Sequence, residues 1–321
     1  MKKTLVALSV LAAASAQAGI ELYNQDGVTV NLKGDIEVTY QNSKTHSSMT
    51  QQIEDADFGF DVRYAMNDQV SFGAYWEFDG SDSNNSTSTK NGDTYVALYT
   101  QDYGSFKVGR LCTAIDDAGI DNSDQFGVNA FFDNSDLACG DESLRYDYDN
   151  GSFYGTLAYR QNKLDGKTDT GTTGEDNSYV DAKVGYRVAD FDFTVFYADA
   201  ETVAVKQDET LLALEVRYSG FENLNLEAAI YNVDFDVAGS SYDNNTYAVA
   251  ADYTMGKWTF STGYSDTEFG ATKKDESVAF VNTAYALAPN TKAYIEFAKV
   301  DSDKTSVTND NLAAIGVEAS F

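Results

Sequence analysis

Regular alternation of apolar and polar residues is the feature that most restricts what this chain can fold into. In "VTVNLKGDIEVTY", residues 28–40, the apolar side chains hold even positions and the charged ones hold odd positions. "DFGFDVRY", residues 57–64, repeats the pattern, and many later stretches do the same. Successive side chains of a β-strand point to opposite faces, so a period of two predicts strands with one apolar and one polar face. The predicted class is all-β.

The alternating runs follow one another along the whole chain and predict sixteen strands. Their expected ranges are 28–41, 54–66, 69–79, 93–101, 105–111, 143–149, 152–162, 177–188, 191–200, 209–218, 224–234, 245–254, 257–266, 276–287, 291–301 and 310–321. Short turns such as "MND", "QDYG" and "TMGK" alternate with long polar loops such as "KLDGKTDTGTTGED". An even strand number with this asymmetry of connections is typical of a transmembrane antiparallel β-barrel of the outer membrane.

The aromatic residues beside the short turns favour a barrel in lipid over a soluble β-sandwich. On the apolar face, one aromatic residue lies at each of ten strand ends next to a short turn. They are Tyr64, Phe106, Tyr148, Phe153, Tyr186, Phe191, Tyr218, Tyr253, Trp258 and Tyr285. Such residues would form one ring, the belt expected where lipid headgroups meet hydrocarbon. A sandwich would instead bury its aromatic residues in the middle of its strands.

Both ends of the chain fit this prediction. Lys2 and Lys3, the apolar run "TLVALSVLAAA" and the small residues "AQA" predict a signal peptide over residues 1–18, which leaves 19–321 as the barrel domain. The apolar run is too short to span a bilayer as a helix. The stretch "AAIGVEASF", residues 313–321, alternates and is predicted to be the closing strand, with Phe321 in the periplasmic ring.

Charge and composition restrict the partners. The formal net charge is −29, and phosphate binding needs clustered lysine and arginine, so no nucleic acid is expected. The single histidine, His46, lies in the polar run "QNSKTHSSMTQQ" and is predicted to be a loop residue without a role. Asp116 and Asp117 could serve as an acid–base pair, but a charged lining is the favoured interpretation. We expect no enzymatic activity, no cofactor and no metal.

One stretch resembles a known family. "YVALYTQDYGSFKVGR", residues 95–110, is similar to a strand–turn–strand of the general diffusion porins of Gram-negative bacteria, with weaker matches in "GDIEVTY" and the final "ASF". The resemblance covers the whole mature chain in architecture. It implies a passive channel for small hydrophilic solutes in the outer membrane, a homotrimer, and contact with membrane lipid and lipopolysaccharide. It also implies a third loop that folds into the lumen and narrows it.

The resemblance places the constriction in a third loop over Leu111–Glu142. Here "DQFG", residues 124–127, is similar to the acidic-Phe-Gly element of the family. The loop residues predicted to line the constriction are Asp116, Asp117, Asp121, Asp124 and Phe126. The family sets arginines on the facing wall, whereas the matching positions here carry Asp57, Gly92 or Asp93, and Asp141. A different basic wall is possible, because strand parity points seven bases inward: Lys33, Arg63, Arg145, Arg160, Lys183, Arg187 and Arg217.

Strand parity also predicts the charge of the lumen. Thirteen acids point inward: Asp35, Glu37, Asp57, Asp61, Glu77, Asp93, Asp147, Asp181, Asp192, Glu215, Glu227, Asp252 and Glu296. They outnumber the inward bases, so a cation preference is expected. The alternative is a substrate-selective porin for oligosaccharides, which would use the inward aromatic residues as stacking positions: Tyr75, Tyr95, Tyr99, Tyr154, Phe196, Tyr231 and Tyr294.

The two cysteines, Cys112 and Cys139, are expected to form a disulfide. An exported chain enters an oxidising compartment, where an even cysteine count usually means pairing. Cys112 ends the fifth predicted strand and Cys139 precedes the sixth, and antiparallel neighbours can bring two cysteines within bonding reach. The bond would close the third loop at its base. Two separate free thiols are the alternative.

Overall fold

The computed structural model describes residues 19–80, 89–129, 138–162, 177–202, 207–237 and 239–321. The predicted signal peptide, residues 1–18, lies outside the described residues and stays a prediction. The elements in the described part are β1 (Ile20–Gln25), β2 (Val28–Ser43), β3 (His46–Asn67), β4 (Val70–Asp79), β5 (Lys90–Thr100), β6 (Gly104–Cys112), the 3-10 helix η1 (Ala114–Asp117), β7 (Cys139–Asp149), β8 (Phe153–Asn162), β9 (Asn177–Val188), β10 (Phe191–Thr202), β11 (Gln207–Phe221), β12 (Leu224–Val237), β13 (Ser240–Met255), β14 (Trp258–Phe269), β15 (Lys274–Ala288), β16 (Thr291–Ser302) and β17 (Asn311–Ser320).

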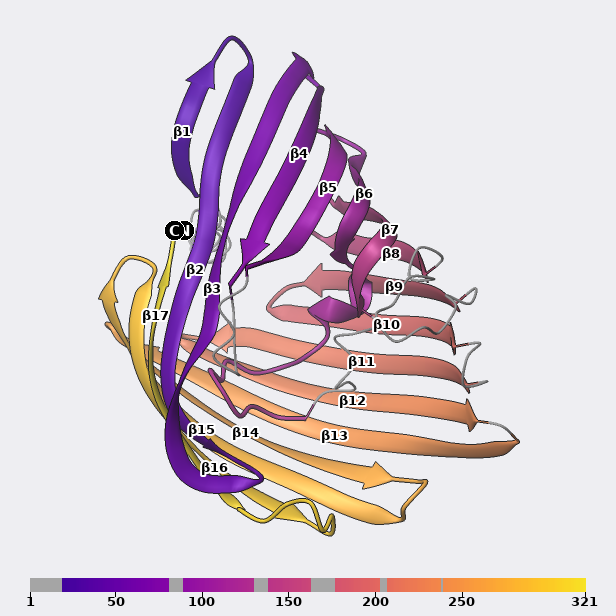
Figure 1. The fold of residues 1–321 in the computed structure, drawn as a ribbon, viewed down its shortest axis with the longest axis vertical. Coiled ribbons are helices and arrows are strands. Elements are labelled where there is room, and N and C mark those ends of the chain that lie inside the picture. The colour runs from indigo at the N-terminus through magenta and orange to yellow at the C-terminus, as the bar shows by residue number, and fades with distance from the viewer. Residues whose placement is uncertain (1–18, 81–88, 130–137, 163–176, 203–206, 238) are drawn as a thin grey trace.

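Strands β2 to β17 close into one barrel, as Figure 1 shows. Each strand pairs antiparallel with the next, and β17 pairs with β2 through partners such as Val317 and Val38. Closure gives every strand two neighbours, which satisfies the backbone groups that lipid cannot. All sixteen predicted strands are present, and the predicted fold is confirmed.

Strand β1 was not predicted. It pairs with the first part of β2, with Ile20 opposite Leu32, while β17 pairs with the second part. Between them, the Phe321 amide donates to the Gly34 carbonyl over 2.8 Å, and the Gly34 amide donates back over 2.9 Å. β1 and β17 therefore lie end to end along one edge of β2.

Strand β3 is longer than expected. It begins at His46, whereas the alternation placed its start at residue 54. The added stretch "HSSMTQQ" is polar and largely exposed, so no apolar face marks it as a strand. The expectation that His46 lies in a loop is wrong, because it is the first residue of this strand, with its Nδ1 2.8 Å from the Thr45 hydroxyl.

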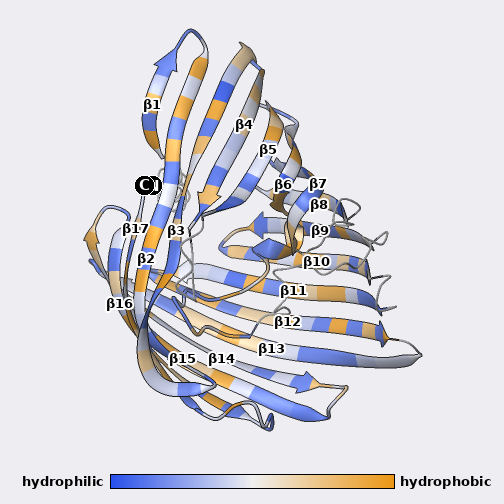
Figure 2. Ribbon diagram, in the orientation of Figure 1, coloured by the Kyte–Doolittle hydropathy of each residue, from blue (hydrophilic) through white to orange (hydrophobic). Residues whose placement is uncertain are grey.

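The outer surface of the barrel is apolar. Figure 2 shows hydrophobic and hydrophilic residues alternating along the strands, and outward residues such as Leu214, Val249 and Phe260 are exposed. The aromatic residues beside the turns meet as cross-strand neighbours: the rings of Phe191 and Tyr218 have centroids 4.6 Å apart. Within the described residues, no helix is both long and apolar enough to cross a membrane.

Candidate functional site

The described part of the third loop, residues 113–129 after β6, runs inside the barrel (Figure 1). Its helix η1 lies against β8, β9 and β10. Ile115 and Ile120 are buried and pack into one cluster with Phe196 of β10 and Leu211 of β11. Burial of these side chains against the inner wall removes apolar surface from water and stabilises the inward position of the loop.

Carboxylates of the wall bind the backbone of the loop. The Asp181 carboxylate on β9 accepts hydrogen bonds from the amides of Ala114 and Ile115, over 3.1 and 2.8 Å. Further along, Glu215 on β11 accepts from the Gly119 amide over 2.6 Å. Both acids are fully buried. Hydrogen bonds to a charged group are stronger than neutral ones, so these contacts fix the path of the main chain.

Two acids hold the middle of the loop: one belongs to the wall and the other to the loop itself. Glu227 on β12 accepts from the Asp121 amide over 2.7 Å. The Asp121 side chain turns back into its own loop, where it accepts from the amides of Ser123 and Val128 over 2.8 and 2.7 Å. Asp121 was predicted to line the constriction. Its carboxylate instead stabilises the conformation of its own loop.

The tip of the loop is bound by Glu296 on β16. Its carboxylate accepts from the amides of Asp124 and Phe126, over 2.7 and 2.6 Å, and from Asn282 Nδ2 over 2.7 Å. The Asp124 side chain is 2.6 Å from Lys292 Nζ on the wall. Phe126 packs against a second buried cluster on β15, β16 and β17. The "DQFG" element thus docks on the wall as a unit.

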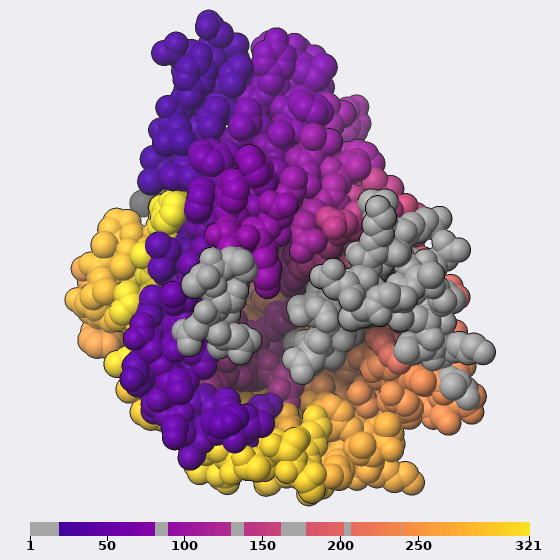
Figure 3. All heavy atoms as spheres, viewed as in Figure 1, coloured from indigo at the N-terminus to yellow at the C-terminus, as the bar shows by residue number. Residues whose placement is uncertain are grey.

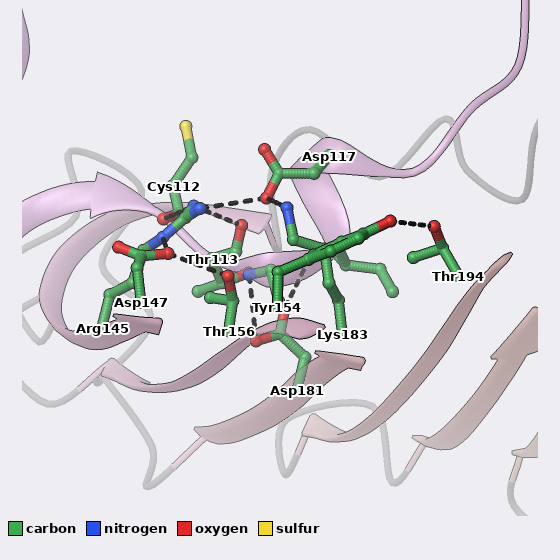
Figure 4. A network of polar contacts seen from close by, with 12 residues as sticks. Cys112, Thr113, Asp117, Arg145, Asp147, Tyr154, Thr156, Asp181, Lys183 and Thr194 are labelled. Carbon is green, nitrogen blue, oxygen red and sulfur yellow. Dashed lines mark hydrogen bonds and ion pairs between the residues drawn. The ribbon is translucent and has the colours of Figure 1, made fainter. Parts of the chain in front are cut away.

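Arg145 on β7 joins the base of the loop to the wall, as Figure 4 shows. Its guanidinium lies 3.0 Å from Asp117 of η1 and 2.8 Å from Asp147, and it donates to the Thr113 carbonyl over 3.0 Å. Lys183 on β9 approaches the same Asp117 oxygen to 2.5 Å. The predicted constriction residue Asp117 is therefore shared by two bases.

A disulfide closes the loop at its base. Cys112 and Cys139 are direct partners in the β6–β7 register and are bonded, which confirms the predicted pairing. The Arg160 guanidinium lies against Gly140 beside this bond. Asp116 is exposed nearby, and its pKa is raised because partial burial desolvates it and because Asp117 is a negative neighbour.

The inward bases are neutralised locally. Lys33 and Arg63 share Asp61, each with a nitrogen 3.1 Å from its carboxylate. Arg187 pairs with Asp149 over 2.9 Å. Arg217 lies 2.8 Å from Glu215, and together these pairs leave little free positive charge in the part of the wall described.

The wall from β2 to β5 carries four acids that form no ion pair within the described residues. The hydrogen bonds of the loop reach Glu37 on β2 and residues of β7, β9, β11, β12 and β14 to β16. Asp57, Glu77 and Asp93 lie on β3 to β5, and Asp35 lies on β2. Among the described residues, no lysine or arginine nitrogen lies within 4.0 Å of a carboxylate oxygen of these four acids. Predicted lining residues Asp57 and Asp93 therefore belong to one acidic face of the wall, whereas Asp117 and Asp124 belong to the loop.

The space-filling view shows the molecule hollowed near its centre, and cavities in the described part of the chain adjoin the inner wall (Figure 3). One of about 520 Å³ adjoins the acidic face and is lined by Asp35, Asp57, Glu77 and Glu318 among others. A second, of about 630 Å³, adjoins β6 to β11 and is lined by Lys183, Arg187 and Arg217 with several acids. The second cavity also adjoins Asp117 of the loop.

Sequence reasoning missed two groups of residues. Lys107, Lys292 and Glu318 face inward and form ion pairs, and strand parity alone could have found them. The role of the wall carboxylates had no signal, because their partners are backbone amides, which every loop residue except proline offers.

A closed barrel that is apolar outside, charged inside and narrowed by an inward loop defines a channel protein of the outer membrane. The comparisons with known proteins make the class specific. The model of the Gram-negative porin family matches residues 4–305. The chain belongs to this family, whose members are outer-membrane channels and not enzymes.

Individual relatives agree over nearly the whole length. Porin-like protein H of Photobacterium profundum is 31% identical over 326 residues, covering 95% of this chain and 96% of that protein. Outer membrane protein U of Vibrio parahaemolyticus is 28% identical, covering 99% and 96%. The solved trimer form of OmpT of Vibrio cholerae matches with a TM-score of 0.76 at 20% identity, covering 92% of this chain and all of that one, and shows the fold.

Proposed function

We propose that the protein is a passive pore for small hydrophilic solutes and ions, with a preference for cations. The observation that carries the preference is the acidic face of Asp35, Asp57, Glu77 and Asp93, which forms no ion pair within 4.0 Å among the described residues, while the bases on the other side are paired. Fixed charge beside a low-dielectric wall enriches counter-ions in a pore.

The reversal potential of the purified protein in a planar bilayer under a KCl gradient tests the preference. We expect cation selectivity that weakens as salt rises, because ions screen the lining charges. The double variant Glu77→Gln/Asp93→Asn should lower the selectivity. Asp68→Asn, in an exposed turn between β3 and β4, is the matched control and should not change it. Anion preference of the wild type in dilute KCl contradicts the proposal.

Oligosaccharide selectivity is the second candidate, favoured by the cluster of Tyr75 and Tyr95, whose centroids are 5.5 Å apart. Two observations weigh against oligosaccharide selectivity. The Arg63 guanidinium covers the ring of Tyr99 at 4.0 Å. Tyr231 is almost completely buried at the wall. Saturable block of the conductance by sugars would favour this second function.

We further propose that three copies assemble as a homotrimer in contact with lipid and lipopolysaccharide. The support is membership of the family and the trimer form in which OmpT of Vibrio cholerae was solved. The mass of the detergent-solubilised protein by light scattering tests the proposal, and a monomer under conditions that preserve the heat-stable barrel contradicts it.

A further inference from the structure

Four inward tyrosine rings lie on glycines of a neighbouring strand. The pairs are Tyr75 on Gly59, Tyr99 on Gly73, Tyr154 on Gly185 and Tyr294 on Gly316. These glycines are buried although they face the inside of the barrel, because the rings cover them. Each ring therefore leans sideways along the wall.

Only glycine leaves room for these rings. A Cβ atom at Gly59 would lie 2.6 Å from the hydroxyl oxygen and 2.7 Å from Cζ of Tyr75. At Gly185 it would lie 1.9 Å from Cζ of Tyr154. Carbon atoms that are not bonded settle at about 3.5–4.0 Å. A single added methyl group therefore forces the ring to move.

The lumen side is the direction left for that movement, and at Tyr99 and Tyr154 the ring would push against the guanidinium of Arg63 or Arg187, each 4.0 Å from the ring centroid. Tyr75 lines the cavity of about 520 Å³, and Tyr99 and Tyr154 line the cavity of about 630 Å³. On the opposite side each ring meets the strand that carries its glycine. The Tyr75 hydroxyl donates to Glu77 over 2.6 Å, which holds the ring along the wall at present.

We propose that Gly59, Gly73 and Gly185 set the calibre of the pore. By giving each tyrosine ring a place against the wall, they keep that ring out of the path of the solute. The inference rests on the proposed diffusion function and identifies residues that determine its size limit. Gly316 differs, because Tyr294 lies under the loop and hydrogen-bonds Gln125, so a methyl group there would press on the loop tip.

Single-channel conductance and liposome swelling with sugars of increasing size test the proposal. Gly59→Ala should lower the conductance and slow the entry of large sugars more than that of small ones. The double variant Gly59→Ala/Tyr75→Ala should regain the wild-type values, because no ring remains to be displaced. Gly155→Ala is the matched control: Gly155 lies between the inward-facing Tyr154 and Thr156, and its Cβ would meet a backbone oxygen at 3.1 Å and no ring.

Heat-modifiable mobility in SDS gels establishes that each variant is folded. If Gly59→Ala does not fold, Gly73→Ala with Tyr99→Ala makes the same test on another pair. Wild-type conductance in a folded glycine variant overturns the proposal, and so does a double variant that stays as restricted as the single one. If the wild type conducts but the glycine variants do not behave as expected, only the proposal on pore calibre is overturned and the diffusion function stands. If the wild type does not conduct, the diffusion function and the proposal on pore calibre are both overturned.

Discussion

Glu296 is the residue on which the tip of the third loop depends most. One buried carboxylate accepts from the amides of Asp124, Gln125 and Phe126 and from Asn282. Four donors on two oxygen atoms leave the carboxylate no other role. The loop tip and this side chain therefore form one structural unit, although 170 positions separate Glu296 from Phe126.

Glu296→Gln should loosen the tip of the loop. The variant keeps the shape of the side chain but replaces an acceptor oxygen by an NH₂ donor that faces other donors. Leaving buried amides unpaired costs about 1–3 kcal/mol. We expect more open-channel current noise and faster proteolysis within the loop. Glu268→Gln, which is exposed on β14, is the control, and identical traces from both variants would contradict the anchoring role.

At the scale of elements, the third loop is fixed at its base by a covalent bond and over residues 114–129 by hydrogen bonds. The Cys112–Cys139 disulfide closes the loop where β6 and β7 part. A bridge of this kind restricts the unfolded chain, and for a loop of this size the effect is about 3.5 kcal/mol. The bond therefore adds to the stability of the barrel as well as to the position of the loop.

Reduction should lower the thermal stability of the protein. We expect the wild-type unfolding temperature to fall in reductant, because the loop-closing constraint on the unfolded chain is lost. The double variant Cys112→Ser/Cys139→Ser should unfold at that lower temperature with or without reductant. Intact mass after alkylation without reductant provides an independent check, and two added alkyl groups would show that the purified protein lacks the bond.

The strands could be predicted from the sequence because lipid enforces the alternation. Each outward residue meets hydrocarbon, so the apolar positions repeat every two residues through β13 and β14 alike. Where that environment ends the signal ends as well, and so the polar first part of β3 was missed. β1 was missed for a related reason, since all of its residues are exposed.

The inner face was harder to predict. Parity correctly pointed Asp181, Glu215, Glu227 and Glu296 inward, but it could not say that the loop would bind them. Expected to line the pore as free charges, they are bound to main-chain amides. Whether a carboxylate meets water or an amide depends on the path of the loop, which alternation along a strand does not encode.

At the scale of the whole molecule, the barrel has an outer surface built for lipid. Val249 is 53% exposed near the middle of β13, and its neighbours on that face are also apolar. The closed sheet leaves no backbone edge in the hydrocarbon. The stability of the folded state therefore depends on which face each strand presents.

Val249→Arg should weaken the barrel in membranes. An arginine facing lipid at the midplane costs about 2–4 kcal/mol, and the cost falls to near zero toward the interfaces. Ser241→Arg is the matched control, because Ser241 shares the parity of Val249 but lies at the end of β13. The urea midpoint in liposomes should drop for the first variant only. Equal midpoints would mean that the facing of β13 is wrong.

The wall carboxylates bind the third loop by its main chain. The position of the loop therefore does not depend on the side chains that the loop presents to the lumen. Every residue except proline offers the same amide, so substitutions along the loop can replace side chains and leave the anchors unchanged. A lineage can then alter the chemistry that a solute meets without having to evolve a new support for the loop. In this architecture, solute preference can diverge quickly while the scaffold stays constant.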